Sequence, residues 1–298
     1  MVSFPDISPE IFSFNVLGFN IALRWYAVSY IAGFMCAIFL MKKYIRSPNL
    51  WYLKRPPMDY TQAESLLTYL IMGVIFGGRL GYVLFYNIEF YISNPLAVLR
   101  LWDGGMAFHG GFVGVVLAVA IHVKINKNDL WSSADLIAIA TPPGLLFGRL
   151  ANFINAELWG RPTNVPWGVV FPGERAQECL NVVGDCARHP SQLYEAGLEG
   201  LLLFLILISF SFFGALRKPG LITGVFSLGY GASRFFVEYF RVPDPQFFSG
   251  SNPFGYAYQL GGFGVTMGQL LSVPMIFLGL LLIILSSLGF LKINYENS

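Results

Sequence analysis

Arginine, asparagine and glutamate side chains gather in one short stretch of an otherwise apolar chain. The stretch GRLANFINAELWG (148–160) contains Arg149, Asn152, Asn155 and Glu157. Arg149 and Asn152 are three residues apart, so a helix places them on the same face. A guanidinium group donates in a fork that matches phosphate oxygens, and amide groups add further donors. The stretch therefore has the side chains of an anion-binding site.

A second polar set recurs at helical spacing in GYGASRFFVEYFR (229–241). Tyr230, Arg234, Glu238 and Arg241 follow one another at steps of four, four and three residues. On a helix these steps place all four on one stripe, which must then face protein or water. Two interpretations stay open: an Arg234–Glu238 ion pair that only braces the helices, or donors directed at an anionic ligand.

Histidine supplies the candidate proton acceptor. In DGGMAFHGG (103–111), glycine pairs flank His109 and allow close backbone approach. A histidine titrates near neutral pH and can act as a base, although a packed histidine bonded to a carbonyl group is an equal alternative. His189, in HPSQLYE (189–195), is expected to cap or line the same cavity, and His122 has no expected role.

Other catalytic patterns are missing from the sequence. There is no metal-ligand spacing, no P-loop and no GxSxG elbow. We therefore expect neither a metal nor a cofactor, and any nucleophile would be brought by a substrate.

The elements that must position these residues are membrane helices. Of the 298 residues, 55% are hydrophobic and only 12% are charged, whereas soluble domains carry about 25% charged residues. Several segments approach the ~20 apolar residues that cross a bilayer. They are residues 17–41, 66–87, 106–123, 136–155, 194–214, 221–240 and 267–291. The predicted fold is an all-α polytopic membrane protein with about seven transmembrane helices, the first of which is retained and not cleaved as a signal.

Lysine placement predicts the orientation. Lysines fall after the first, third, fifth and seventh segments, at Lys42, Lys43, Lys54, Lys124, Lys127, Lys218 and Lys292. The positive-inside rule then places the N-terminus outside and the C-terminus in the cytoplasm. Residues 88–105, 156–193 and 241–266 become outer loops, and the three polar clusters all lie on the outer side.

We expect one integral-membrane domain over residues 1–298, with its largest outer insert at 156–193. Cys179 and Cys186 share that insert, and their spacing leaves a disulfide and two free thiols equally open. Pro142 and Pro143 are expected to break or bend the fourth segment, because proline removes helical hydrogen bonds.

Four arginines fall inside the predicted segments: Arg24, Arg79, Arg149 and Arg234. An ionised group at mid-bilayer costs about 2.5–3.5 kcal/mol. Arg24 lies close enough to the outer face to extend to the headgroups, and Arg79 either does the same or pairs internally. That explanation does not account for the polar residues around Arg149 and Arg234.

The stretch GRLANFINAELWG resembles the central motif of the bacterial prolipoprotein diacylglyceryl transferases, G-R-x-G/A-N-F-x-N-x-E-x-x-G. The matching positions are Gly148, Arg149, Asn152, Phe153, Asn155, Glu157 and Gly160. FHGG (108–111), HPSQLYE, GYGASRFFVEYFRVPD (229–244) and LRWYAVSYIAGF (23–34) also resemble blocks of that family, in the family's order. The resemblance covers most of the chain.

The resemblance implies an enzyme of the bacterial cytoplasmic (inner) membrane with its active site towards the outer leaflet. It would transfer the diacylglyceryl group of phosphatidylglycerol to the lipobox cysteine of a prolipoprotein, releasing glycerol-1-phosphate. Arg149 and Arg234 would hold the phosphate, and His109 would accept the thiol proton. Asn152 and Tyr230 would orient the phosphate, and Glu157 and Glu238 would aim the arginines. Tyr26, Gly160 and Arg241 would complete the lipid site.

Two other classes of protein also explain buried arginines. A lipid or anion transporter could line a cavity with them, although it needs access from both faces and the polar clusters lie on one. A scaffold could use them only to brace helices. Nothing suggests a nucleic-acid partner.

Overall fold

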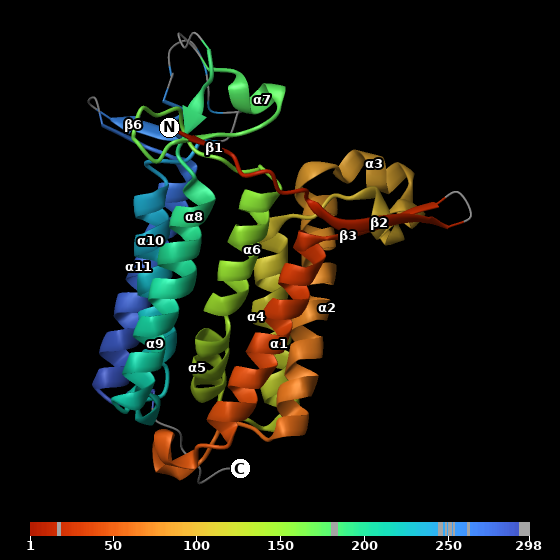
Figure 1. Ribbon diagram of the computed structural model, residues 1–298. Helices are drawn as coiled ribbons and strands as arrows, with labels where there is room; N and C mark the ends of the chain where they lie inside the picture. Colours follow the sequence, from red (N-terminus) through yellow and green to blue (C-terminus); the bar gives the residue numbers. More distant parts are fainter. Residues whose placement is uncertain are drawn as a thin grey trace.

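The structure is a bundle of long helices with small β elements at one end (Figure 1). This computed structural model describes residues 1–16, 19–179, 184–243, 247, 249, 252, 254–260 and 263–291. The side chains of residues 16, 19–21, 108, 109 and 260 lie outside that description.

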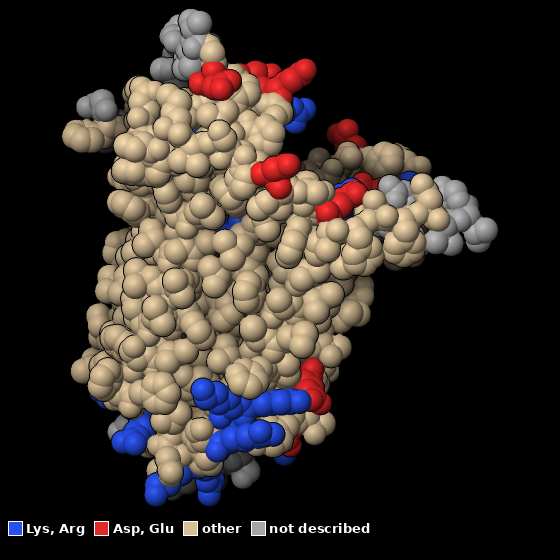
Figure 2. Space-filling view, in the orientation of Figure 1, with Lys and Arg blue, Asp and Glu red and all other residues tan. Residues whose placement is uncertain are grey.

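Within the described residues, five helical stretches are long and apolar enough to cross a membrane. They are α1 (Trp25–Ile45), α2 (Tyr60–Tyr86), the α5–α6 stretch (Leu130–Ile154), the stretch from α8 to α9 (Ser191–Phe212) and α11 (Met267–Ser287). Two shorter apolar helices, α4 (Phe108–Asn126) and α10 (Leu221–Val237), complete the bundle. The flank of the bundle is nearly free of charge (Figure 2). The chain is therefore a helical polytopic membrane protein, as predicted, and the count of seven crossings stays a prediction.

The remaining elements are short. They are β1 (Val2–Ser3), β2 (Glu10–Val16), β3 (Phe19–Arg24), η1 (Pro48–Leu50), η2 (Tyr52–Lys54), α3 (Ile88–Ser93), η3 (Pro95–Leu99), η4 (Leu101–Asp103), β4 (Val169–Val170), α7 (Glu174–Gln177), β5 (Ala187–Arg188), the π-helix η5 (Ala196–Leu202), η6 (Ala215–Arg217), β6 (Tyr258–Leu260) and β7 (Phe263–Val265). The strands form a three-stranded sheet in the order β1-β4-β5 and the hairpins β2-β3 and β6-β7.

The first predicted helix begins too early. Residues up to Arg24 form the β2-β3 hairpin, which projects sideways from the bundle, and α1 begins only at Trp25 (Figure 1). The error arises because a hydrophobic average does not separate strand alternation from a helix, and this segment alternates with period two. Arg24 therefore lies on a strand, where its exposed guanidinium pairs with Glu10 at 3.3 Å.

The predicted break in the fourth segment is confirmed. Helix α5 (Leu130–Ala140) ends before Thr141, and α6 (Pro142–Ile154) begins with its two prolines at the first helical positions. Proline is tolerated there because those N–H groups have no helical partner. The hydroxyl of Thr141 donates to the carbonyl of Ile137 at 2.8 Å. Helix α6, which carries Arg149, thus starts at a defined position inside the bundle.

Glycine sets the spacing of α2 and α4. A Cβ atom added at Gly114 would lie 2.0 Å from the carbonyl oxygen of Gly73, and one at Gly110 would lie 2.3 Å from that of Gly77. Only glycine permits this contact, and such small-residue interfaces are typical of membrane helix pairs. The close backbone approach expected beside His109 is therefore present at Gly110.

Arg79 pairs internally and does not extend to the headgroups. Its guanidinium, in a side chain only 3% exposed, donates to five backbone carbonyls in the segment between α2 and α4. The acceptors are Ala97 at 2.8 Å, Val98 and Arg100 at 2.9 Å, Gly105 at 3.2 Å, and Gly104. The guanidinium also lies over the ring of Tyr91. Arg79 therefore supports the loop that leads into α4.

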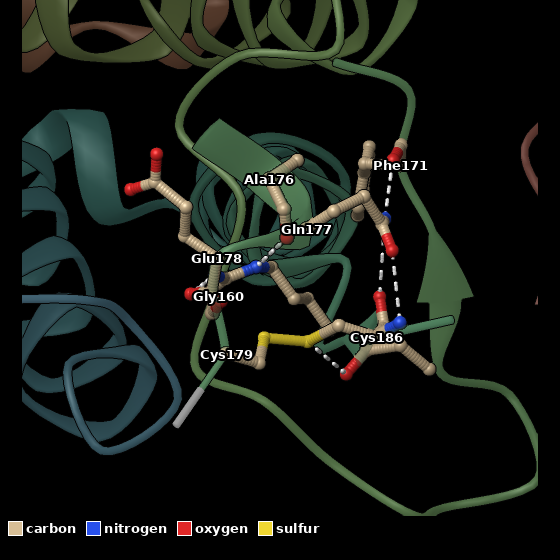
Figure 3. The surroundings of a disulfide bond; sticks show 9 residues. Gly160, Phe171, Ala176, Gln177, Glu178, Cys179 and Cys186 are labelled. Carbon is tan, nitrogen blue, oxygen red and sulfur yellow. Dashed lines mark hydrogen bonds between the residues drawn. A yellow bond between two sulfur atoms is a disulfide. The ribbon is translucent and has the colours of Figure 1, made fainter. Parts of the chain in front are cut away.

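The insert at 156–193 contains a disulfide. Cys179 and Cys186 are bonded, which decides the alternative that the sequence left open (Figure 3). Arg188, in the same insert, donates to the carbonyls of Ala176 at 2.5 Å and Glu178 at 3.0 Å. Burial lowers the pKa of the Arg188 guanidinium, because no solvent stabilises its charge there.

Candidate active site

Three arginines and three glutamates from separate parts of the bundle form one cluster, here called the arginine–glutamate cluster. Its members are Arg149 on α6, Glu195 on α8, Glu199 on η5, Arg234 on α10, and Glu238 and Arg241 just after α10. The interior of a helix bundle solvates ions poorly, so charges there must be paired. The formal charges of the six groups balance.

Glu195 lies at the centre of this cluster. Its side chain is 1% exposed, and its Oε2 lies 2.8 Å from Nε of Arg149. Its Oε1 accepts hydrogen bonds from Nη1 of Arg234 and Nη1 of Arg241, each at 2.6 Å. One carboxylate thus engages three guanidinium groups.

The other two carboxylates, Glu238 and Glu199, each form ion pairs with one or two of the arginines. Oε2 of Glu238 lies 3.1 Å from Nη2 of Arg234 and 3.6 Å from Nε of Arg241. Glu199 is fully buried, and its Oε2 lies 3.8 Å from Nη2 of Arg149. The expectation that Glu238 contacts the arginines matches this geometry. Tyr230, on the same stripe of α10, interacts electrostatically with Glu199, Arg149 and Arg234.

Glu157 contacts the asparagines of its own motif. Its Oε1 accepts from Nδ2 of Asn152 at 2.7 Å and from Nδ2 of Asn155 at 3.4 Å. Among the described ion pairs, those of Arg149 go to Glu195 and Glu199. The structure thus gives Glu157 no ion pair with an arginine in the described residues, in contrast to the aiming role expected from the resemblance.

The loop around Glu157 has a constrained backbone. Ala156 and Leu158 both adopt positive φ angles, 51° and 57°, which are unfavourable for residues with a Cβ atom. Helix α8 fixes this loop, because Gln192 donates to the carbonyl of Glu157 at 2.5 Å and Ser191 donates to that of Leu158 at 3.0 Å. Helix α8 therefore links Glu157 to the arginine–glutamate cluster.

Gly160 joins the insert at 156–193 to the segment that follows α10. It forms an isolated β-bridge with Arg241. A Cβ atom at Gly160 would lie 2.4 Å from the carbonyl oxygen of Phe240 and 2.8 Å from that of His189. Only glycine fits at this close backbone contact, and the contact places Arg241 against the insert.

The tyrosine expected in the site, Tyr26, contacts a second tyrosine of α1 that lies near Glu157. The hydroxyl of Tyr26 on α1 is 3.1 Å from that of Tyr30, and Tyr30 interacts electrostatically with Glu157. Tyr26 is 39% exposed, so it lies at the surface of the bundle.

The two histidines on this side have different surroundings. His109 lies in the first turn of α4, and its side chain is outside the described part of the structure. Nδ1 of His189 lies 3.1 Å from the hydroxyl of Tyr194, and the ring packs against Phe240. Burial lowers the pKa of His189, which favours the neutral ring.

Glu195 and Glu199 were not predicted as site residues from the sequence. The signal was present, because two carboxylates four residues apart fall at the start of an apolar segment, as the arginines do. Their ion-pair partners are 39 or more residues away in the chain, so spacing alone did not connect them.

An apolar helix bundle that keeps three arginines and their carboxylates near one end is a membrane protein with a buried cluster of charged side chains. A family model described as prolipoprotein diacylglyceryl transferase matches residues 12–285.

Phosphatidylglycerol–prolipoprotein diacylglyceryl transferases are similar to the chain along nearly its whole length. The relative from Cereibacter sphaeroides is 56% identical over 286 residues, covering 96% of this chain and 98% of its own. The relative from Ruegeria pomeroyi is 57% identical over 281 residues, covering 94% and 95%. A relative from Rhizobium leguminosarum is 44% identical over 281 residues, covering 94% and 92%. The chain belongs to the prolipoprotein diacylglyceryl transferase family, which confirms the resemblance found in its motifs.

Proposed function

We propose that this protein transfers the diacylglyceryl group of phosphatidylglycerol to the lipobox cysteine of prolipoproteins, the first step of bacterial lipoprotein maturation. Family membership supports the reaction. One observation supports this chemistry most directly: Arg149, Arg234 and Arg241 all contact the same buried carboxylate, that of Glu195. Guanidinium groups in a membrane interior suit an anionic lipid headgroup, because they donate to phosphate oxygens in matching pairs.

The reaction exchanges one bond at a glyceryl carbon. The lipobox sulfur attacks the carbon bonded to the phosphate oxygen, the C–S bond forms, and the C–O bond breaks with its electron pair going to the phosphate. Glycerol-1-phosphate leaves. Its phosphate gains a second negative charge, which Arg149 and Arg234 stabilise.

The thiol must lose its proton during attack, since a free cysteine with a pKa of about 8.5 is mostly protonated at neutral pH. We assign His109 as the acceptor, directly or through a water molecule. The glycine contact of Gly110 with Gly77 supports this assignment, because it fixes the first turn of α4, where His109 lies.

The remaining site residues orient the lipid. We assign Asn152, Tyr230, Tyr26, Gly160 and Arg241 to the phosphatidylglycerol site. Glu238 positions Arg234 and Arg241, and Glu157 acts through Asn152, in keeping with their contacts.

The proposed topology has seven crossings, the N-terminus outside and the C-terminus in the cytoplasm of a bacterial inner membrane, in one domain with an outer insert at 156–193. Lys42 and Lys43 lie in the last turn of α1, and basic side chains gather at that end of the bundle (Figure 2). Basic residues favour the cytoplasmic side. The site then opens towards the outer leaflet, where phosphatidylglycerol and the prolipoprotein signal peptide meet it.

A reconstituted assay tests the function. Purified protein, phosphatidylglycerol and a lipobox peptide should yield a thioether-linked lipopeptide and an equal amount of glycerol-1-phosphate. A peptide with serine in place of the lipobox cysteine is the control and should yield neither. Lipid movement between leaflets without any thioether would instead indicate a transporter.

A further inference from the structure

We propose that Glu195 is a positioning residue for the transfer reaction. Its carboxylate fixes the three guanidinium groups of Arg149, Arg234 and Arg241 at the spacing that one phosphate group can bridge. This inference rests on the proposed function and adds a residue that neither the motif nor the resemblance assigned.

The three arginines do not meet without an anion between them. They come from α6, α10 and the segment after α10, and their like charges repel one another strongly where water is scarce. Glu195 contacts all three guanidinium groups at 2.6–2.8 Å. A carboxylate offers about four lone-pair directions, so it can accept from several arginines at once.

The contacts of Glu195 leave part of each arginine accessible. The side chains of Arg149, Arg234 and Arg241 are 20%, 19% and 18% exposed. Within the described residues, Arg149 uses Nε and Nη2 for its ion pairs, and Arg234 uses Nη1 and Nη2. Nη1 of Arg149 and Nε of Arg234 therefore have no described ion-pair partner and are available to a headgroup.

Glu195 itself has a fixed position. It ends α8, whose first residues, Ser191 and Gln192, are bonded to the carbonyls of Leu158 and Glu157. A π-helix follows directly, and such wide turns occur often at functional sites. The same short helix, α8, therefore contacts both the arginines and the loop that carries Glu157.

The neighbouring carboxylates do not have this central position. Glu238 contacts two arginines at 3.1 Å and 3.6 Å, and Glu199 contacts one at 3.8 Å. Loss of Glu195 should therefore release more guanidinium groups than loss of either neighbour.

Glu195→Gln tests the inference, because it keeps the shape of the side chain and removes its charge. We expect kcat/KM for phosphatidylglycerol to fall by about 100-fold, with kcat falling more than KM rises. That split arises because the misplaced arginines fail mainly at the phosphate charge that develops in the transition state. The inhibition constant of added glycerol-1-phosphate should rise by about 10-fold or more.

Asp135→Asn is the matched structural control. Asp135 is another buried carboxylate of the bundle, and it accepts from Gly220 and Thr223 at the start of α10. We expect this variant to lower Tm while kcat/KM and the glycerol-1-phosphate inhibition constant stay within about 3-fold of wild type. Glu195→Asp, which keeps the charge, should recover part of the activity lost in Glu195→Gln.

A double-mutant cycle with Arg241→Gln completes the test. If Glu195 acts through the arginines, the two losses should be clearly less than additive. Wild-type kcat/KM in a folded Glu195→Gln variant, or strictly additive losses, would overturn the inference. Absence of thioether product from the wild-type protein would instead contradict the proposed function, so the two failures are distinct.

Discussion

At the scale of single residues, the planar shape of the guanidinium group explains why arginine suits this site. Each of Arg149 and Arg234 already contacts two carboxylates, and a planar guanidinium has five donors, enough to bind a phosphate as well. Lysine lacks this fork. Each arginine can therefore bind a carboxylate and a phosphate at the same time.

Arg149→Ala and Arg234→Ala should each abolish detectable transfer, a loss of about 1,000-fold or more, because the leaving phosphate loses a stabilising cation. Both proteins should still be extracted from membranes as folded monodisperse species. The measurement is lipopeptide formation by purified protein, with circular dichroism as the control. Aggregation or degradation of both variants would favour the scaffold interpretation.

His109→Gln should reduce turnover by about 100-fold while binding of phosphatidylglycerol changes little, since the base acts on the thiol and not on the lipid. The acidic limb of the pH–rate profile should also disappear, because a histidine must be neutral to accept a proton. A variant whose profile coincides with that of wild type would remove His109 as the base.

At the scale of elements, glycine contacts between α2 and α4 hold the helix that carries His109. Gly114→Val should force the two backbones apart, because even a Cβ atom would lie 2.0 Å from the carbonyl of Gly73. We expect a loss of about 3 kcal/mol or more, measured as a lower Tm in detergent. Gly144→Ala is the control, since a Cβ atom there meets nothing within 4 Å, and its Tm should not fall.

At the scale of the whole molecule, the insert at 156–193 contacts the helix bundle through Gly160 and α8. Replacing Cys179 and Cys186 with serine should lower the stability of the insert by about 2–3 kcal/mol, as expected for a short closed loop. Limited proteolysis measures this as faster cleavage between residues 161 and 190. Reductant should have the same effect on wild type and none on the double variant. Equal cleavage rates of the oxidised wild type and the double variant would contradict the prediction that the disulfide stabilises the insert.

Sequence reasoning alone was enough for the class of protein, the approximate places of the helices and four of the six members of the arginine–glutamate cluster, Arg149, Arg234, Glu238 and Arg241. Apolar length requires membrane helices, and Pro142 and Pro143 require a break. Helical spacing placed Tyr230 and Arg234 on one face of α10, but Glu238 and Arg241 follow the end of that helix, and Arg241 lies in a β-bridge with Gly160. These are local properties, and local spacing decides them. Only the tertiary structure decided the start of α1, the carbonyl partners of Arg79 and the central place of Glu195. Each depends on pairing between residues far apart in the chain, such as Arg149 with Glu195 or β2 with β3, and chain spacing carries no information about which distant partner will neutralise a buried charge.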